Sequence, residues 1–154
     1  MTLVELVVAI TLVGAAAAAM VSSFGWLTQQ SSDPLVTRQA TAVGEAMLAE
    51  VLAQGTGSTD PDGGAEGLGP ESGEARGSTT LPFDHVNDYH GFDQTGVTAL
   101  DGGAIAGLEA YRVRVSVRAA TLGSGTPSQG WWVDVRVGMP GGGEVLLSGW
   151  KAAL

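Results

Sequence analysis

The chain has 154 residues, a formal net charge of −9 and no cysteine. Its seven lysines and arginines form no cluster, and binding to a phosphate backbone requires a basic patch, so we expect no nucleic-acid partner. The absence of cysteine excludes disulfides, thiol catalysis and thiolate metal sites. The length suits one ordinary domain together with an extended element.

An apolar run from Leu3 to Val21 contains a single charge, Glu5. As a helix this run would be roughly 28 Å long, close to the thickness of about 30 Å of a bilayer core. We therefore predict a membrane-spanning or filament-core helix over residues 1–27, with Gly14 as its weak point. The apolar side chains expected in the membrane or the filament core are Leu3, Val4, Leu6, Val7, Val8, Ile10, Leu12 and Val13.

The single carboxylate of this segment, Glu5, is expected to have a positively charged partner. A charge at the centre of a membrane helix costs about 2.5 to 3.5 kcal/mol on insertion scales and rarely stands alone. No lysine or arginine precedes the run, as the positive-inside rule would require of a signal anchor. Both features are explained if Met1 follows a removed basic leader and carries a free α-amine. We expect Glu5 to pair with such an ammonium group on a neighbouring subunit and so to set axial register.

The opening residues, MTLVEL, resemble the mature N-terminus of type IV pilins and type II secretion pseudopilins. That pattern is an apolar first residue, often Phe, then Thr-Leu-hydrophobic-Glu-hydrophobic and a long apolar run. The chain departs from it with Met1, and with Ser22 where many pilins carry proline. The resemblance implies cleavage of a leader by a prepilin peptidase, N-methylation of Met1 and assembly into a helical fibre.

Residues 28–54 are predicted to continue the helix as an amphipathic half, with an irregularity at 31–34 because proline disfavours helix in the residue before it. The apolar stripe recurs at steps of three and four residues, at Val36, Ala40, Val43, Met47 and Val51. Glu45 and Glu50 lie off this stripe. Gly55 stands where a helix cap is typical.

Residues 55–107 are rich in glycine and aspartate and are predicted to form loops. Two stretches contain candidate cation ligands, namely Asp60, Asp62 and Glu66, and then Asp84, Asp88 and His90. The first lacks the glycine and the final acid of an EF-hand loop. The second has no recognised metal spacing, and such residues more often bond the local backbone. We therefore expect no metal, no cofactor and no catalytic residue.

Residues 108–154 alternate apolar and polar side chains, as half-buried strands do. Three successive strands with short links predict an antiparallel sheet whose apolar face the helix covers, which gives an α+β class. The residues expected on the apolar face include Tyr111, Val113, Val115, Val117, Trp131, Val133, Val135 and Val137. Residues 28–154 would then be one globular domain, and the whole chain would have the pilin fold that the N-terminal resemblance implies.

Four further segments follow the order seen in minor pilins of the mannose-sensitive haemagglutinin pilus type, the MshD-like group. They are RQATAVGEAMLAEVLAQ, FDHVNDYHGF, LEAYRVRVSV and WWVDVRVGMPGGGEVLLSGW. The group's acidic Asp-Tyr-His-Gly segment is matched by Asp88, Tyr89, His90 and Gly91, to which we assign no role.

The resemblance implies a structural minor pilin, with a position in the tip or priming complex as one possibility. It would cross a bacterial inner membrane once, with a periplasmic C-terminal domain, and then enter an extracellular pilus beside other pilin subunits. Two alternatives stay open: a pseudopilin of a type II secretion system, and a membrane-anchored binding domain without an assembly role. The last predicts an uncut leader and tolerance of Glu5→Ala. Adhesion through Trp131, Trp132 or Tyr89 is compatible with the pilin interpretation.

Overall fold

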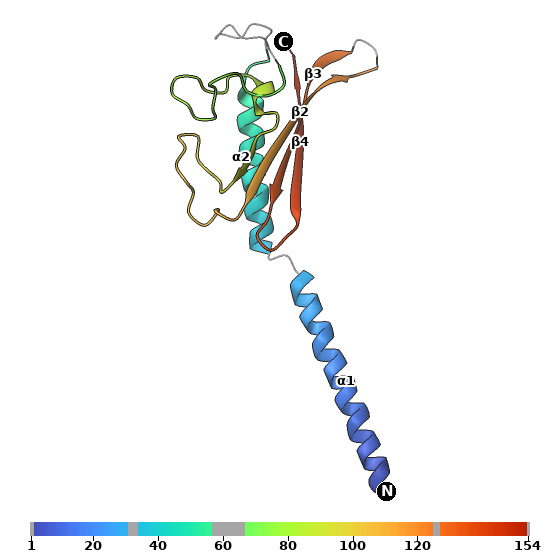
Figure 1. The fold of residues 1–154 in the computed structure, drawn as a ribbon. Coiled ribbons are helices and arrows are strands. Elements are labelled where there is room, and N and C mark those ends of the chain that lie inside the picture. Colours follow the sequence, from blue (N-terminus) through green and yellow to red (C-terminus); the bar gives the residue numbers. More distant parts are fainter. Residues whose placement is uncertain (1, 31–33, 57–66, 125–126, 154) are drawn as a thin grey trace. The chain divides into compact units, whose positions relative to one another are not determined.

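The computed structural model describes residues 2–30, 34–56, 67–124 and 127–153 (Figure 1). The chain divides into two compact units, Met1–Asp33 and Pro34–Leu154. The sequence predicted the division after residue 27, whereas the structure has it after residue 33. Each unit is described by itself below.

The first unit is the helix α1, Leu3–Gln30, which runs through Gly14 without interruption. Eighteen residues, Leu3–Met20, have a mean hydropathy of 2.3, and none of them is buried within the chain. Leucine, valine and alanine dominate this stretch. By length and composition α1 therefore qualifies as a membrane anchor or as a signal sequence.

The helix α2, Pro34–Ala53, opens the second unit with a proline in the first turn, where its missing N–H removes no helical bond. The predicted stripe is confirmed at Ala40, Val43, Met47 and Val51, which are buried, while Val36 is only partly buried. The predicted irregularity at 31–34 falls largely on residues 31–33, which lie outside the described residues.

Gly55 lies just past the end of α2, where a capping glycine was expected, because the last helical residue is Ala53. Its conformation is not that of a left-handed cap, since Gly55 is absent from the glycines with positive φ. Its N–H instead donates to the Asp84 carbonyl at 2.8 Å, and its own carbonyl accepts from Val86 N at 3.1 Å. A Cβ at this position would lie 3.1 Å from the Asp84 oxygen, so the close approach of two chain segments accounts for the glycine.

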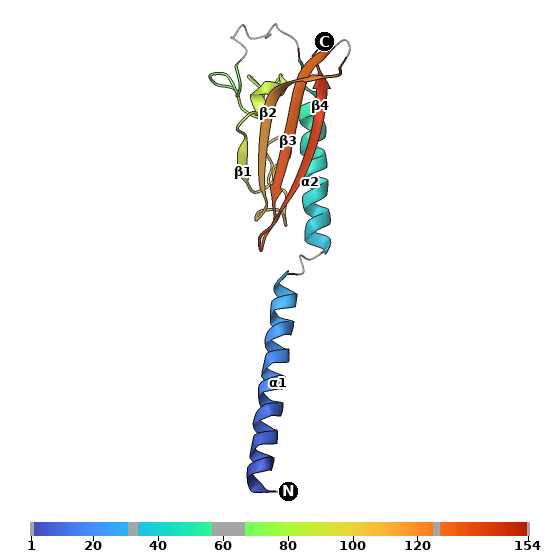
Figure 2. The same ribbon diagram turned by 90° about the vertical axis from the view of Figure 1, so that its right-hand side faces the viewer.

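The sheet is antiparallel, in the order β1-β2-β3-β4 (Figure 2). The strands β2, Arg112–Leu122, β3, Ser128–Gly138, and β4, Glu144–Ala152, confirm the three that were predicted. The strand β1, Asp93–Thr95, was not predicted and lies in the region assigned to loops. Its three residues carry no alternation long enough to recognise, and pairing with β2 defines them as a strand.

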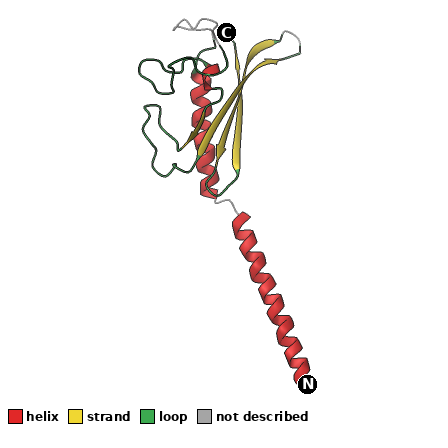
Figure 3. Cartoon of the chain, in the orientation of Figure 1, coloured by secondary structure: helices red, strands yellow, loops and turns green. Residues whose placement is uncertain are grey.

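One face of the sheet packs against α2 (Figure 3). The valines at 113, 115 and 117 of β2 and at 133, 135 and 137 of β3 are each at most 3% exposed, as the alternation predicted. Trp131 is half-buried at the edge of this core. The predicted loop region adds Val86 and Tyr89 to the core from the short 3-10 helix η1, Val86–Tyr89.

Glycines and a lysine bring α2 close to β4. A Cβ on Gly149 would come within 3.1 Å of Leu52 Cδ1, and one on Gly44 would clash with Leu147. The Lys151 ammonium donates to the Leu52 carbonyl at 2.6 Å and to the Gln54 carbonyl, where the end of α2 is partially negative.

Candidate functional site

The first turn of α1 is the first candidate site, because it contains the only charge of the apolar segment. Glu5 Oε2 accepts from Thr2 N at 3.3 Å, while Glu5 N donates to Thr2 Oγ1 at 3.3 Å. This reciprocal pair is a capping box, and a carboxylate in a first turn also suits the helix dipole. Sequence reasoning missed this pair, although Thr-x-x-Glu before an apolar run is its signature. Met1 lies outside the described residues.

The apolar side chains of Leu3–Met20 are not buried by any described part of the chain. All eight that the sequence placed in a membrane or a filament core are exposed, from 49% for Leu6 and Val8 to 83% for Leu3. A Cβ on Gly14 would meet nothing within 4 Å. An apolar surface of this length is stable only against lipid or another apolar surface.

A polar cluster joins the loops to α2 in the second unit. Arg76 Nε and Nη2 donate to the two carboxylate oxygens of Glu50, at 2.6 and 2.7 Å. The guanidinium also donates to Thr98 O at 3.2 Å and Thr98 Oγ1 at 3.1 Å. Tyr89 OH donates to Glu50 Oε1 at 2.9 Å. The side chains of Arg76 and Glu50 are only 10% and 17% exposed.

The protonation states of this cluster suit fixed hydrogen bonds that hold the loops to α2. Burial raises the pKa of the Tyr89 hydroxyl, and the neighbouring Glu50 carboxylate raises it further. The bond to Glu50 raises the pKa of Arg76. Tyr89 thus stays neutral and Arg76 charged at neutral pH. Sequence reasoning placed Glu50 off the buried stripe and missed its partner, because the two residues are 26 apart in the chain.

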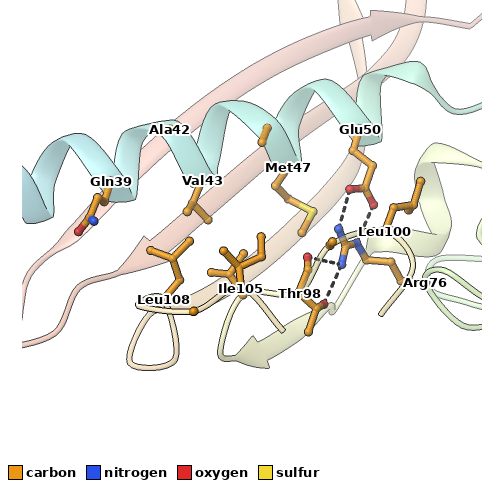
Figure 4. A pocket seen from close by; sticks show the side chains of 14 residues that line it. Gln39, Ala42, Val43, Met47, Glu50, Arg76, Thr98, Leu100, Ile105 and Leu108 are labelled. Atoms are coloured by element: carbon orange, nitrogen blue, oxygen red, sulfur yellow. Dashed lines mark hydrogen bonds and ion pairs between the residues drawn. The ribbon is translucent and has the colours of Figure 1, made fainter. Parts of the chain in front are cut away.

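An apolar groove of about 530 Å³ lies between α2 and the loop of residues 97–108 (Figure 4). The Glu50–Arg76 pair stands at one end of it (Figure 4). Its walls are mostly aliphatic, with Ala42, Ala46 and Met47 from α2 and Leu100, Ile105 and Leu108 from the loop. We call this side of the domain, α2 and the loop of residues 97–109, the groove face.

The candidate cation ligands are brought together only in part. Asp84 and Asp88 lie with His85, their ligand atoms within 4.8 Å of one another. His90, the third residue that the sequence named, is not part of this cluster, and its Nδ1 accepts from Val117 N of β2 at 3.2 Å. Asp60, Asp62 and Glu66 lie outside the described residues.

Local backbone bonds account for this acidic cluster. Asp88 Oδ2 accepts from His85 N at 2.7 Å and from Asp84 N at 3.1 Å, which secures the start of η1. The Asp84 carboxylate lies 2.8 Å from His85 Nδ1. Burial raises the pKa of Asp88 against the lowering effect of these backbone bonds. The expectation that aspartates here bond the local backbone is confirmed for Asp88, whereas the Asp84 carboxylate contacts the His85 side chain and Asp93 pairs with Arg112.

The face of the sheet that turns away from α2 is charged and aromatic, and we call it the open sheet face. Arg112 and Asp93 form a bidentate pair at 2.6 and 2.7 Å. Arg114 and Arg136 share the carboxylate of Glu144. The other side chains on this face are Ser116, Arg118, Trp132, Asp134, Leu146, Ser148 and Trp150.

The aromatic residues considered for adhesion lie in three different environments. Tyr89 is 1% exposed, which removes it as a surface contact. Trp131 packs on the core side of the sheet. Only Trp132 belongs to the open sheet face, where the Arg118 guanidinium lies 5.4 Å from its ring centre and its N–H donates to Asp134 at 3.0 Å.

No protein-family model, no curated protein and no solved structure matches the chain.

Proposed function

We propose that the chain is a structural subunit of a type IV pilus, a minor pilin held in the inner membrane by α1 and then assembled with other pilins. The observation that carries this proposal is an exposed apolar helix with a single carboxylate in its first turn, in the pattern MTLVEL. The second unit, in which a helix packs on a four-stranded antiparallel sheet, is compatible with the pilin fold. The sheet-bearing domain would be periplasmic before assembly.

Within its own helix the Glu5 carboxylate accepts the backbone N–H of Thr2, and the proposal gives it a second partner on another subunit. In an apolar surrounding a carboxylate needs more than one backbone N–H, because an uncompensated charge there is costly. The N-terminal ammonium group of a neighbouring subunit would neutralise it and fix the axial position of one helix on the next. Prepilin peptidase would create that ammonium group at Met1.

The first experiment is mass spectrometry of the N-terminal peptide of the protein produced from its native gene and membrane. A peptide that begins at Met1 with a methylated amine supports prepilin processing. A peptide that still carries a leader before Met1 contradicts the proposal and favours a membrane-anchored domain without an assembly role.

Two variants separate the intermolecular role of Glu5 from its capping role. Glu5→Gln keeps the capping box, in which glutamine replaces glutamate well, but removes the charge. Thr2→Ala removes the cap, at about 1 kcal/mol, but keeps the charge. We expect Glu5→Gln to abolish recovery of the chain in sheared filaments, and Thr2→Ala to retain most of it. The reverse order would show that Glu5 only caps its own helix.

A further inference from the structure

The open sheet face differs in charge from the rest of the chain. Four of the seven basic residues lie on it, together with the three carboxylates Asp93, Asp134 and Glu144. Its formal charge is therefore +1, in a chain whose total is −9. Glu144 forms ion pairs with both Arg114 and Arg136, which lie directly opposite each other on β2 and β3.

This face also has the composition of a protein contact. Across β2, β3 and β4 it carries a row of Arg118, Trp132 and Trp150. The next row but one adds Leu146, which is 50% exposed. Arginine and tryptophan are the residues that most often dominate binding at protein interfaces. Within the described residues of the second unit, α2 lies on the other side of the sheet and no helix covers this face (Figure 2).

The groove face has the complementary properties. It offers an apolar groove between α2 and the loop of residues 97–108. The exposed charged residues on the same two elements are the acids Glu45, Asp101 and Glu109 and the base Arg38, so their formal charge is −2. Because α2 packs on the side of the sheet opposite the open face, the two faces look in different directions from one domain.

We propose that the open sheet face of one copy docks on the groove face of a second copy. The arginines meet the exposed acids of α2 and the loop, and the apolar side chains of the sheet face cover the groove. The net repulsion between two acidic chains is screened beyond about 8 Å at physiological salt, so the charges in contact decide the outcome. Such a head-to-tail contact joins two different surfaces, one from each copy.

This inference deepens the proposed function and rests on it, since it names the surfaces by which assembled subunits touch outside α1. The chain has no cysteine, so any disulfide between two copies must join engineered cysteines. Ser116→Cys marks the open sheet face and Ala46→Cys marks the groove face. Thr79→Cys, on an exposed loop outside both faces, is the matched control.

The experiment oxidises membranes that contain two co-expressed full-length variants and scores disulfide-linked dimers. We expect dimers from Ser116→Cys with Ala46→Cys, and at least about tenfold fewer from either variant with Thr79→Cys or by itself. Adding Arg114→Gln and Arg136→Gln lowers the yield by about tenfold, as does a change from low to high salt. Arg38→Glu, which reverses an exposed arginine on α2, does not lower it.

Three results would overturn the inference: no dimers, dimers from Ser116→Cys alone, or a yield that salt leaves unchanged. The salt series tests the same electrostatic contribution without any arginine variant, so its result does not depend on whether the double arginine variant folds. An N-terminus processed at Met1 without cross-linked dimers refutes this contact and leaves the pilin proposal standing. Dimers from a chain with an uncut leader refute the pilin proposal and leave the contact.

Discussion

At the scale of single residues, Arg76 holds together segments that the sequence separates. It comes from a glycine-rich loop, yet its side chain is 10% exposed and bonds both Glu50 on α2 and Thr98 on the following loop. The pair Arg112–Asp93 has similar distances but is 56% and 40% exposed. Breaking the buried pair Glu50–Arg76 should cost more stability than breaking Arg112–Asp93, because an exposed pair competes with water and salt.

We predict that Arg76→Ala lowers the free energy of unfolding by about 3 kcal/mol, because it leaves the Glu50 carboxylate buried and uncompensated. Urea unfolding of the full chain in detergent, followed by circular dichroism, measures this. Arg112→Ala is the matched control, and its midpoint stays close to that of the unchanged chain. Equal effects of the two variants would show that burial of the Glu50–Arg76 pair does not affect the free energy of unfolding.

Asp88 makes stability depend on pH. Its carboxyl has a raised pKa in the folded chain because of burial, so the folded state holds this proton more tightly than the unfolded state does. Stability from this group is therefore lost as pH rises from the unfolded pKa of about 4 through the folded pKa.

We predict that Asp88→Asn, which keeps an oxygen that can accept the His85 and Asp84 N–H bonds, removes this loss. The stability of the variant relative to the unchanged chain should rise between pH 4 and pH 7 in urea titrations. Glu45→Gln, at an exposed carboxylate on α2, is the control. A difference that stays constant with pH would contradict the raised pKa.

At the scale of elements, the pairing of β3 with β4 depends on one missing side chain. A Cβ on Gly130 would lie 2.8 Å from the Trp150 ring and closer still to the Lys151 carbonyl oxygen. Gly138, at the other end of β3, has 3.7 Å to its nearest neighbour, Arg112. The first glycine is thus required by packing, and the second is not.

We predict that Gly130→Ala destabilises the chain by about 1 to 3 kcal/mol, because β4 must shift to make room. Gly138→Ala should change stability by less than about 0.5 kcal/mol. Thermal unfolding of the two variants in parallel measures the contrast. A tolerated alanine at position 130 would mean that Trp150 does not lie over this strand.

At the scale of the whole molecule, the two units differ in what surrounds their apolar side chains. The second unit buries its valines between α2 and the sheet, whereas α1 buries none of Leu3–Met20. The exposed apolar surface of Leu3–Met20 therefore needs lipid or another apolar surface, while the second unit has its own core.

We predict that Leu12→Arg with Ala16→Arg moves the chain out of the alkali-resistant membrane fraction, because each arginine near a helix centre opposes insertion by about 2.5 to 3.5 kcal/mol. Leu12→Val with Ala16→Val, the matched control, stays in it. Unfolding of the second unit should be the same in both. Membrane retention of the arginine variant would show that α1 is no anchor.

Local periodicity in the sequence determined much of this protein. The apolar run predicted α1, the stripe from Val36 to Val51 predicted the buried face of α2, and alternation predicted the buried valines of β2 and β3. These patterns succeed because a helix or a strand repeats at a fixed short period, so the chain's own neighbours specify which face is apolar.

Tertiary structure alone decided the rest. The three residues of β1 became a strand through pairing with β2, and Glu50 became buried because Arg76 reached it from a loop. Likewise His85, rather than His90, joined the two aspartates, since the path of the chain around η1 orients both rings. Each of these outcomes depends on contacts between different segments of the chain, and hydrophobic periodicity predicts only local secondary structure.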